Sequence, residues 1–516
     1  MRKGMIMNVI NRRDFLGILG LGAVSLVMPG LTAAADGNSI AGRKPNIILI
    51  LTDDQGYGDL GRNGNPVIKT PNLDRMYDES IHFEDFHTSP TCAPTRSSIM
   101  TGKHEFKNGV THTILERERM SLKSTTIAQV LKSAGYATGI FGKWHLGDED
   151  EYQPEKRGFD EVYIHGGGGI GQSYPGTCGD APGNSYFNPV IKHNGKFEKT
   201  EGYCTDVFFS QAIKWIESVK EKQPFYIHIT PNAPHAPLDV PEKYEKMYAG
   251  KVEDKAAKFF GMITNIDDNF GRLMSKLKNL GVDDNTLVIY INDNGGTAGC
   301  KVWNAGMRGT KGTAFNGGTR SMSLWRWPGA LKSAPCDKLT AHVDMFPTFV
   351  ELAGVKVPDD VVKKLDGFSL VPLLENPQAK WHDERMLFTH VGRWGGMTPG
   401  AQPEKYGACS VRWQQYLQVW ERSKWCLYDL KDDPGEKADI ADGHKDVVDK
   451  LNKAYDAWWD EVLPCMENEQ AYKTAPQVNP FRAQYWKQYG GPGPNNVPPG
   501  TANPPAAKPA KRDKKK

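Results

Sequence analysis

Cys92 opens the most distinctive short segment of the chain, with Pro94 and Arg96 following at alternate positions. Proline suits the first turn of a helix, so this spacing predicts that Cys92 lies at a helix N-terminus, where anionic groups are stabilised. The same environment lowers the pKa of a thiol and makes it more reactive. From these residues alone, a structural cysteine, a redox thiol and a catalytic nucleophile all remain open.

Two pairs of polar residues each end an apolar run with the composition of a buried strand. Asp53 and Asp54 end one run, and Asp293 and Asn294 end another. Alone, each pair more often forms a turn or a helix cap. Together, at the carboxyl ends of neighbouring strands, they supply hard oxygen ligands suited to Ca²⁺ or Mg²⁺. The sequence contains no Cys/His cluster at zinc spacing.

Further ionisable side chains lie in three short motifs. Lys143 and His145 belong to GKWHLG, His235 to NAPHAP, and Lys311 to MRGTKGT. Taken separately, each lysine would be an ordinary surface charge. His235 alone would be a structural residue of a Pro-rich loop. If the two lysines and Arg96 converge on one oxyanion, they provide the positive field that a tetrahedral anion needs.

The elements that must position these residues follow an α/β pattern. Continuous apolar runs at 46–51, 225–229 and 287–291 predict strands that are covered on both faces. Apolar residues at helical spacing within 208–219 and 259–277 predict amphipathic helices between the strands. We therefore expect a large mixed, mostly parallel sheet sandwiched by helices, with chemistry at the carboxyl ends of its strands.

Changes in composition along the chain predict its domains. Residues 44–375 carry the α/β pattern and form the expected catalytic domain. Residues 376–485 change to short strand-like runs and a helical stretch near 444–462, which predicts a smaller C-terminal subdomain of antiparallel sheet plus helix. Residues 490–516 are rich in Pro and Lys and poor in apolar residues, so we expect a disordered, solubilising tail.

The first 35 residues have the features of an export signal. Arg12 and Arg13 precede Phe15 and an apolar run to Val27, and small residues follow at 33–35. This pattern predicts a twin-arginine signal peptide over 1–35 and a periplasmic or extracellular protein. The alternative is a retained membrane anchor. No later stretch approaches the about 20 apolar residues that span a bilayer, so we expect no stable membrane insertion after signal cleavage.

Bulk composition narrows the class of protein. The chain has 516 residues, of which 39% are hydrophobic, enough for a substantial core. Its 64 Lys+Arg against 61 Asp+Glu give a net charge of +3, too even to indicate a nucleic-acid partner. Of the eight cysteines, Cys178 with Cys204 and Cys409 with Cys426 are candidate disulfide pairs, with free buried thiols as the alternative.

These motifs, in this order and over nearly the whole mature chain, resemble those of the type I sulfatases of the alkaline phosphatase superfamily. The segment 92–96 is similar to their C-x-P-x-R activation motif, and 427–436 to their C-terminal L-Y-D-L-x-x-D-P-x-E signature. The resemblance implies that a formylglycine-generating or sulfatase-maturating enzyme oxidises Cys92 to formylglycine. In the family the aldehyde is hydrated, one hydroxyl attacks sulfur and the second drives elimination of sulfate.

The resemblance also implies a role for each candidate residue. One calcium ion is bound by the oxygen ligands and the modified cysteine: Asp53, Asp54, Cys92, Asp293 and Asn294. Lys143 and Lys311 hold sulfate oxygens, and Arg96 steadies the formylglycine. His145 hydrogen-bonds a hydroxyl of the hydrated aldehyde and assists its deprotonation, and His235 protonates the leaving alcohol. One departure is Asn316, which replaces the glutamate of the E-G-G-x-R segment of many relatives and puts a local support interaction in doubt.

Two other classes remain as alternatives. A phosphatase or phosphodiesterase of the same superfamily commonly uses Ser or Thr with two metals, whereas this chain has a cysteine and lacks the extra His/Asp ligands. A noncatalytic carbohydrate-binding protein is disfavoured because every recognisable catalytic position is retained.

Export favours a sulfated polysaccharide or glycan fragment as substrate, with a small aryl or alkyl sulfate as the alternative. Two loops are candidates for choosing the sugar: 166–188, with Tyr174 and Tyr186, and 390–406. The alternative is that both are ordinary loops without a role in substrate selection.

Overall fold

The computed structural model describes residues 39–114, 117–173, 177–394, 404–466 and 479–491. The predicted signal at 1–35, Tyr174, residues 395–403 of the second candidate loop and the tail from 492 lie outside the described residues. Within the described ranges, no helix has the length and apolar character needed to cross a membrane.

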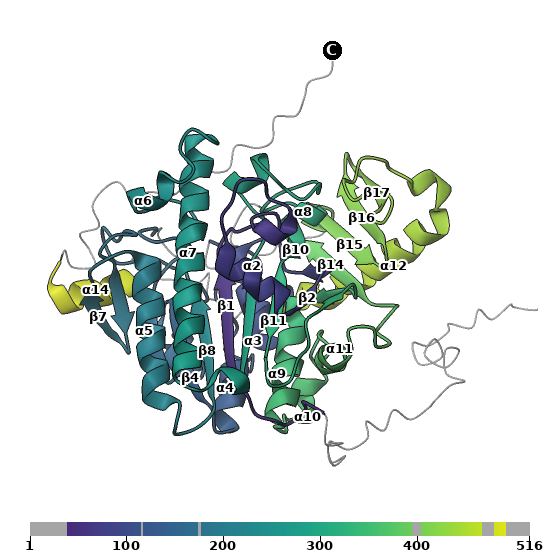
Figure 1. Cartoon of the computed structure of the whole chain (residues 1–516). Helices are drawn as coiled ribbons and strands as arrows, with labels where there is room; N and C mark the ends of the chain where they lie inside the picture. Colours follow the sequence, from purple (N-terminus) through teal and green to yellow (C-terminus); the bar gives the residue numbers. More distant parts are fainter. Residues whose placement is uncertain (1–38, 115–116, 174–176, 395–403, 467–478, 492–516) are drawn as a thin grey trace, which may run out of the picture.

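The predicted apolar runs are strands of one ten-stranded sheet (Figure 1). In their order across the sheet, the strands are β12 (Ala334–Cys336), β2 (Ile81–Phe83), β11 (Ser323–Arg326), β9 (Thr286–Asn292), β1 (Asn46–Thr52), β8 (Phe225–Thr230), β4 (Ala137–Lys143), β5 (Glu161–His165), β6 (Val190–His193) and β7 (Lys196–Lys199). The central strands from β9 to β5 pair in parallel, whereas β11, β6 and β7 pair antiparallel toward the edges. The mixed, mostly parallel sheet is therefore confirmed.

Helices cover both faces of this sheet. One face carries α2 (Pro71–Asp78), α5 (Cys204–Val219) and α7 (Asp254–Asn279), and the other carries α3 (Cys92–Thr101), α4 (Ile127–Ser133) and α9 (Met345–Ala353). Side chains alternate along a strand, so Ile48 and Ile50 pack in the cluster of the first face and Ile47 and Leu49 in that of the second. The burial of β1 on both faces explains its uninterrupted apolar sequence.

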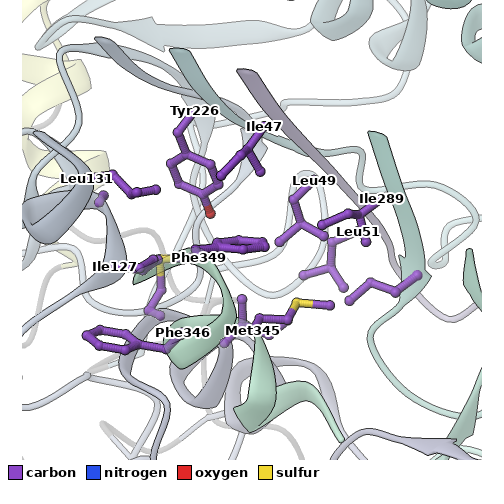
Figure 2. Packing of buried hydrophobic residues seen from close by; sticks show 14 of the residues in the cluster. Ile47, Leu49, Leu51, Ile127, Leu131, Tyr226, Ile289, Met345, Phe346 and Phe349 are labelled. Atoms are coloured by element: carbon purple, nitrogen blue, oxygen red, sulfur yellow. The ribbon is translucent and has the colours of Figure 1, made fainter. Parts of the chain in front are cut away.

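Figure 2 shows the second of these clusters at close range. Ile47, Leu49 and Leu51 of β1 extend toward Met345 and Phe349 of α9. Residues of α4 and Tyr226 of β8 close the cluster on the other side. This packing fixes the sheet against α9 and α4, and it is the rigid base from which the strand ends project.

Short elements complete the large domain. They are α6 (Glu242–Glu245), α8 (Asn316–Thr319), α10 (Asp359–Val362), α11 (Val371–Glu375) and a three-stranded sheet of β10 (Arg320–Ser321), β3 (Phe86–His87) and β13 (Thr340–Ala341). All eight cysteines are free thiols, so neither candidate disulfide is present.

A smaller antiparallel sheet follows in sequence and lies beside the large domain (Figure 1). It contains β14 (Met386–His390), β15 (Cys409–Trp413), β16 (Tyr416–Glu421) and β17 (Lys424–Asp429), and α12 (Lys445–Val462) packs against it. The expectation of an antiparallel sheet with one helix is thus confirmed. Trp458 and Trp459 of α12 share their core with Phe106 of the large domain, so apolar packing joins the two units.

The last described helix, α14 (Pro480–Tyr489), returns to the far edge of the large sheet beside β7 (Figure 1). Phe481 packs edge-on to Phe197 at 5.0 Å between ring centroids. Asn479, the residue before the helix, donates hydrogen bonds to Asp148 Oδ2 at 2.6 Å and to the Thr177 carbonyl. Residues 480–485 were predicted to be part of the C-terminal subdomain, but they pack on the large sheet. The position of this helix depends on complementary side chains on β7, which the local sequence of the helix does not reveal.

A buried ion pair joins the two units where the chain enters the small sheet. Arg385 donates from both terminal nitrogens to the Asp344 carboxylate, at 2.7 and 2.8 Å. The same carboxylate accepts hydrogen bonds from the backbone N–H groups of Ala341 and Phe368. Both partners are fully or nearly fully buried, so the satisfied carboxylate depends on the arginine for its neutralising charge.

Candidate active site

The predicted oxygen ligands meet at the ends of two paired strands. β1 and β9 are parallel neighbours in register, so the residues that follow them lie side by side. The Asp54 N–H donates to Asp293 Oδ1 at 3.2 Å, and Asn294 Nδ2 donates to Asp54 Oδ1 at 3.1 Å. Asp53 is completely buried in the same cluster. The expectation that the two pairs share one strand edge is confirmed.

Cys92 is the first residue of α3, and its side chain is buried. One turn later, Arg96 Nη2 donates to Asp53 Oδ2 at 3.2 Å and to Asp293 Oδ2 at 2.9 Å. Arg96 Nη1 donates to the Lys143 carbonyl at 3.2 Å. The first turn of α3 is thereby fixed to three strand ends, and Cys92 is held above the carboxylates.

Both predicted lysines reach the same carboxylates. The ammonium group of Lys143, the last residue of β4, contacts Asp53 Oδ2, and that of Lys311 contacts Asp54 Oδ1. Gly142 has φ +126°, and a Cβ at this position would lie 2.0 Å from the carbonyl oxygen of Thr230 on β8. Only glycine allows β4 to approach β8 this closely just before Lys143.

The two predicted histidines present opposite ring nitrogens. His145 Nε2 lies 3.0 Å from the Thr113 carbonyl, which can only accept, so Nε2 carries the proton and Nδ1 faces Cys92 Sγ at 3.6 Å. His235 Nδ1 donates to the Ala236 carbonyl at 2.7 Å. This leaves His235 Nε2 facing Asp54 Oδ2 at 3.9 Å. Each imidazole therefore offers one free nitrogen to the cluster.

The buried charges shift the pKa values of the groups that they surround. Burial raises the pKa of the Cys92 thiol, but the positive charges of Lys143 and Lys311 outweigh burial and hold it below its usual value. Burial holds the pKa of His145 well below its ordinary value, so this imidazole is neutral. Burial lowers the pKa of Lys311, but the charge of Asp54 reverses this effect and raises it. A thiol with a lowered pKa and a neutral imidazole thus lie side by side.

The donor set fits a hard divalent cation. Asp53 Oδ1 and Asn294 Oδ1 are buried and, among the described residues, have no hydrogen-bond partner. Ligand atoms of Asp53, Cys92 and Asp293 lie within 4.8 Å of one another. Buried carboxylate and amide oxygens that lack partners are the groups that Ca²⁺ satisfies.

A cavity of about 120 Å³ gives access to this cluster. Four predicted residues line it, namely Cys92, His145, His235 and Lys311. The other lining residues are Thr113, Ile114, Gly168, Gln172, Cys178 and Arg393. Arg96, Lys143 and the oxygen ligands do not line the cavity itself. Asp54 contacts the lining residue Lys311, while Arg96 and Lys143 contact each other and Asp53.

The sequence predicts part of the cavity wall but not all of it. Gly168, Gln172 and Cys178 belong to one predicted loop, and Arg393 to the other. Thr113 and Ile114 carry no motif and were not predicted. Tyr186 is completely buried, and its hydroxyl donates to the His235 carbonyl at 2.6 Å, so it supports the histidine loop and does not line the cavity.

The Asn316 departure has a structural counterpart. Glu436, from the C-terminal signature, accepts a hydrogen bond from the Asn316 N–H at 2.7 Å through Oε1. Its Oε2 accepts from the Arg308 N–H at 3.2 Å. A carboxylate from the small domain therefore supports the segment that carries Lys311.

Comparison with known proteins agrees with this geometry. The sulfatase family model matches residues 45–355, and the model for the C-terminal part of N-sulphoglucosamine sulphohydrolase matches residues 311–458. Arylsulfatase J of Mus musculus is 28% identical over 480 residues, which cover 84% of this chain and 79% of that protein. N-acetylgalactosamine-6-sulfatase of Homo sapiens is 30% identical over 406 residues, which cover 74% of this chain and 75% of that protein.

A solved structure extends the likeness to three dimensions. The crystal structure of Ps i-CgsB in complex with k-i-k-neocarrahexaose has a TM-score of 0.72 and 28% identity, and the match covers 86% of this chain and 97% of that one. The motifs, the strand-end cluster and the family match over most of the chain agree. This chain belongs to the sulfatase family and is a sulfatase.

Proposed function

We propose that this sulfatase releases sulfate from a sulfated polysaccharide or glycan fragment, using formylglycine made from Cys92 and one calcium ion. The observation that carries the proposal is the buried cluster at the start of α3. There the Cys92 side chain faces a neutral imidazole and lies among three carboxylates, two lysines and an arginine. This arrangement suits a nucleophile that must be held against a tetrahedral anion.

The comparisons support a glycan substrate. One relative is named for N-acetylgalactosamine, and the solved structure contains a neocarrahexaose. The cavity wall includes small or polar residues such as Gly168 and Gln172, which leave room for a hydroxylated ring. Export through the twin-arginine pathway, with a periplasmic or extracellular location, belongs to the same proposal because large glycans are met outside the cytoplasm. A sulfatase-maturating enzyme is the required partner.

Two groups that the chain acquires complete the site. Formylglycine at position 92 supplies, as its hydrate, a hydroxyl nucleophile in place of the thiol. Calcium would be held by Asp53, Asp54, Asp293 and Asn294 together with residue 92, and it would supply positive charge that polarises a sulfate ester. Asp53 Oδ1 and Asn294 Oδ1, which are buried and have no hydrogen-bond partner in the described part of the chain, support this ligand set.

The chain's own residues then divide the work of binding and proton transfer. The ammonium groups of Lys143 and Lys311 bind sulfate oxygens, and Arg96 fixes the first turn of α3 against the strand ends. His145 Nδ1, which faces residue 92 and carries no proton, accepts a proton from it. His235 Nε2, which faces Asp54 Oδ2, gives a proton to the leaving alcohol oxygen.

The direct test uses protein produced together with a sulfatase-maturating enzyme. Wild type should release sulfate from a sulfated oligosaccharide, and Cys92→Ala should not, while its circular dichroism spectrum stays unchanged. The tryptic peptide containing residue 92 should be about 18 Da lighter than its cysteine form, because an aldehyde replaces the thiol. The peptide containing Cys178, which lines the same cavity, should keep its unmodified mass. A fully active protein with unmodified Cys92 contradicts the mechanism.

The same preparation tests the cation. Elemental analysis of the purified protein should find one calcium ion per chain. After a chelator has removed the ion, calorimetric titration with Ca²⁺ should show that one ion binds again. Asp53→Asn should lose this binding, whereas Asp78→Asn, at an exposed carboxylate of α2, should retain it. Equal calcium binding by both variants contradicts the ligand set.

A further inference from the structure

Arg393 is a cation of the active-site cavity that takes no part in the buried cluster. The cluster pairs its charges internally: Lys143 with Asp53, Lys311 with Asp54, and Arg96 with Asp53 and Asp293. Arg393 lines the same cavity as Cys92 and Lys311. It forms no hydrogen bond or ion pair with any residue that the structure describes.

The guanidinium group of Arg393 lies against the segment that carries Lys311. A Cβ built on Gly312 would lie 3.4 Å from Arg393 Nη1 and 3.6 Å from its Cζ. Gly312 has φ +77°, so glycine also suits the backbone here. The planar group thus lies close to the residue that follows the sulfate-binding lysine.

The backbone on both sides of Arg393 is fixed by a second arginine. Arg117 donates to the carbonyl of Gly392 and, at 3.2 Å, to the carbonyl of Trp394. Its guanidinium also lies 4.0 Å from the centroid of the Trp394 ring. Gly392 has φ +69°, and a Cβ there would lie 1.9 Å from the Thr111 carbonyl oxygen. These contacts fix the backbone from which the Arg393 side chain extends into the cavity.

We propose that Arg393 binds a second anionic group, a sulfate or a carboxylate, close to the scissile sulfate on the same glycan. This inference rests on the proposed function and names its substrate class more closely. A guanidinium matches the paired oxygens of either group through two parallel hydrogen bonds. Because the proposed mechanism assigns the cluster's lysines to the scissile sulfate, Arg393 is left, among the described residues that line the cavity, as the cation for a further anion. Arg393 is therefore a specificity-determining residue and not part of the chemical step.

The test compares three substrates that share one sugar: the first carries one sulfate, the second two sulfates, and the third one sulfate and one carboxylate. Arg393→Gln should raise KM about tenfold or more for the second or third substrate, as expected for loss of a charge-assisted hydrogen-bonded pair, with kcat nearly unchanged. For the first substrate its KM should change less than about twofold. Arg393→Lys should retain part of the preference for the doubly anionic substrate, because lysine keeps the positive charge but cannot form two parallel hydrogen bonds. The substrate that shows the effect identifies the anion.

Arg75→Gln, at an exposed arginine of α2 outside the cavity, is the matched control and should behave as wild type with all three substrates. An equal loss by Arg393→Gln on all three substrates, or no loss on any, overturns the inference.

Calorimetry can measure how the doubly anionic sugars bind without turnover, using Cys92→Ala with and without Arg393→Gln. An affinity that Arg393→Gln leaves unchanged also overturns the inference. Sulfate release from the first substrate by wild type tests the proposed function separately, so the two failures are distinguishable.

Discussion

Backbone carbonyls fix the orientations of the two active-site imidazoles. The Thr113 carbonyl accepts a hydrogen bond from His145 Nε2, and the Ala236 carbonyl accepts one from His235 Nδ1. Each ring is thereby turned so that its remaining nitrogen faces the reacting groups. This preorganisation removes the need to reorient either ring during a proton transfer.

The proposed roles predict a leaving-group effect for His235. His235→Gln removes the proton donor, so esters of sugar alcohols, whose leaving oxygen is strongly basic, should lose the most. We expect kcat to fall by about 10²-fold or more for a sulfated sugar and far less for an aryl sulfate with an acidic phenol. The measurement is kcat for both substrates in wild type and variant. Equal losses for the two substrates contradict the assignment.

At the residue level, short motifs predicted most of the site because each places one chemical group at the end of a known element. Asp53, Cys92 and Lys143 are examples, since the strand or helix boundary beside each is readable from local sequence. Ile114 and Arg393 reach the cavity only through contacts between distant segments. No local pattern marks them, so only the range containing Arg393 was predicted.

At the element level, β4 must approach β8 without a side chain between them. Gly142→Ala should place a methyl group against the Thr230 carbonyl and strain a backbone at φ +126°. We expect a loss of at least about 2 kcal/mol in the free energy of unfolding. Sulfatase activity should fall as well, because Lys143 is the next residue.

Gly135 supplies the control for this substitution. It lies just before β4 with φ +88°, but a Cβ there meets nothing within 4 Å. Gly135→Ala should therefore lower the free energy of unfolding only by the strain of a positive φ, about 1 kcal/mol, and should leave activity intact. Urea unfolding of both variants checks the difference, and equal costs would show that the close approach to β8 is unimportant.

Helices and strands were predicted most reliably where a pattern of apolar residues extends over many positions. The stripe of apolar residues in α7 and the run in β1 both identify buried elements correctly. Short edge strands such as β7 and β12 contain too few residues for a repeating pattern, and they form because a neighbouring strand is already in place.

At the scale of the whole molecule, the Arg385 to Asp344 pair links the two units through a buried charge. Arg385→Met should leave Asp344 buried without a counter-charge and lower the free energy of unfolding by about 3–5 kcal/mol. Lys246→Met is the control, because it breaks an exposed pair with Glu242 and should cost less than about 1 kcal/mol. Thermal and urea unfolding measure both. A small loss for Arg385→Met means that the pair does not hold the units together.

The overall architecture follows from the alternation of strands and helices, whereas the placement of the last helix does not. Asn479 joins α14 to Asp148 and to the Thr177 carbonyl, next to Cys178 in the cavity wall. Anyone who shortens this protein for crystallisation, or attaches a fusion partner at its end, should therefore leave the chain intact through residue 489. A cut made before residue 479 removes the hydrogen bonds of Asn479 that support this wall of the cavity.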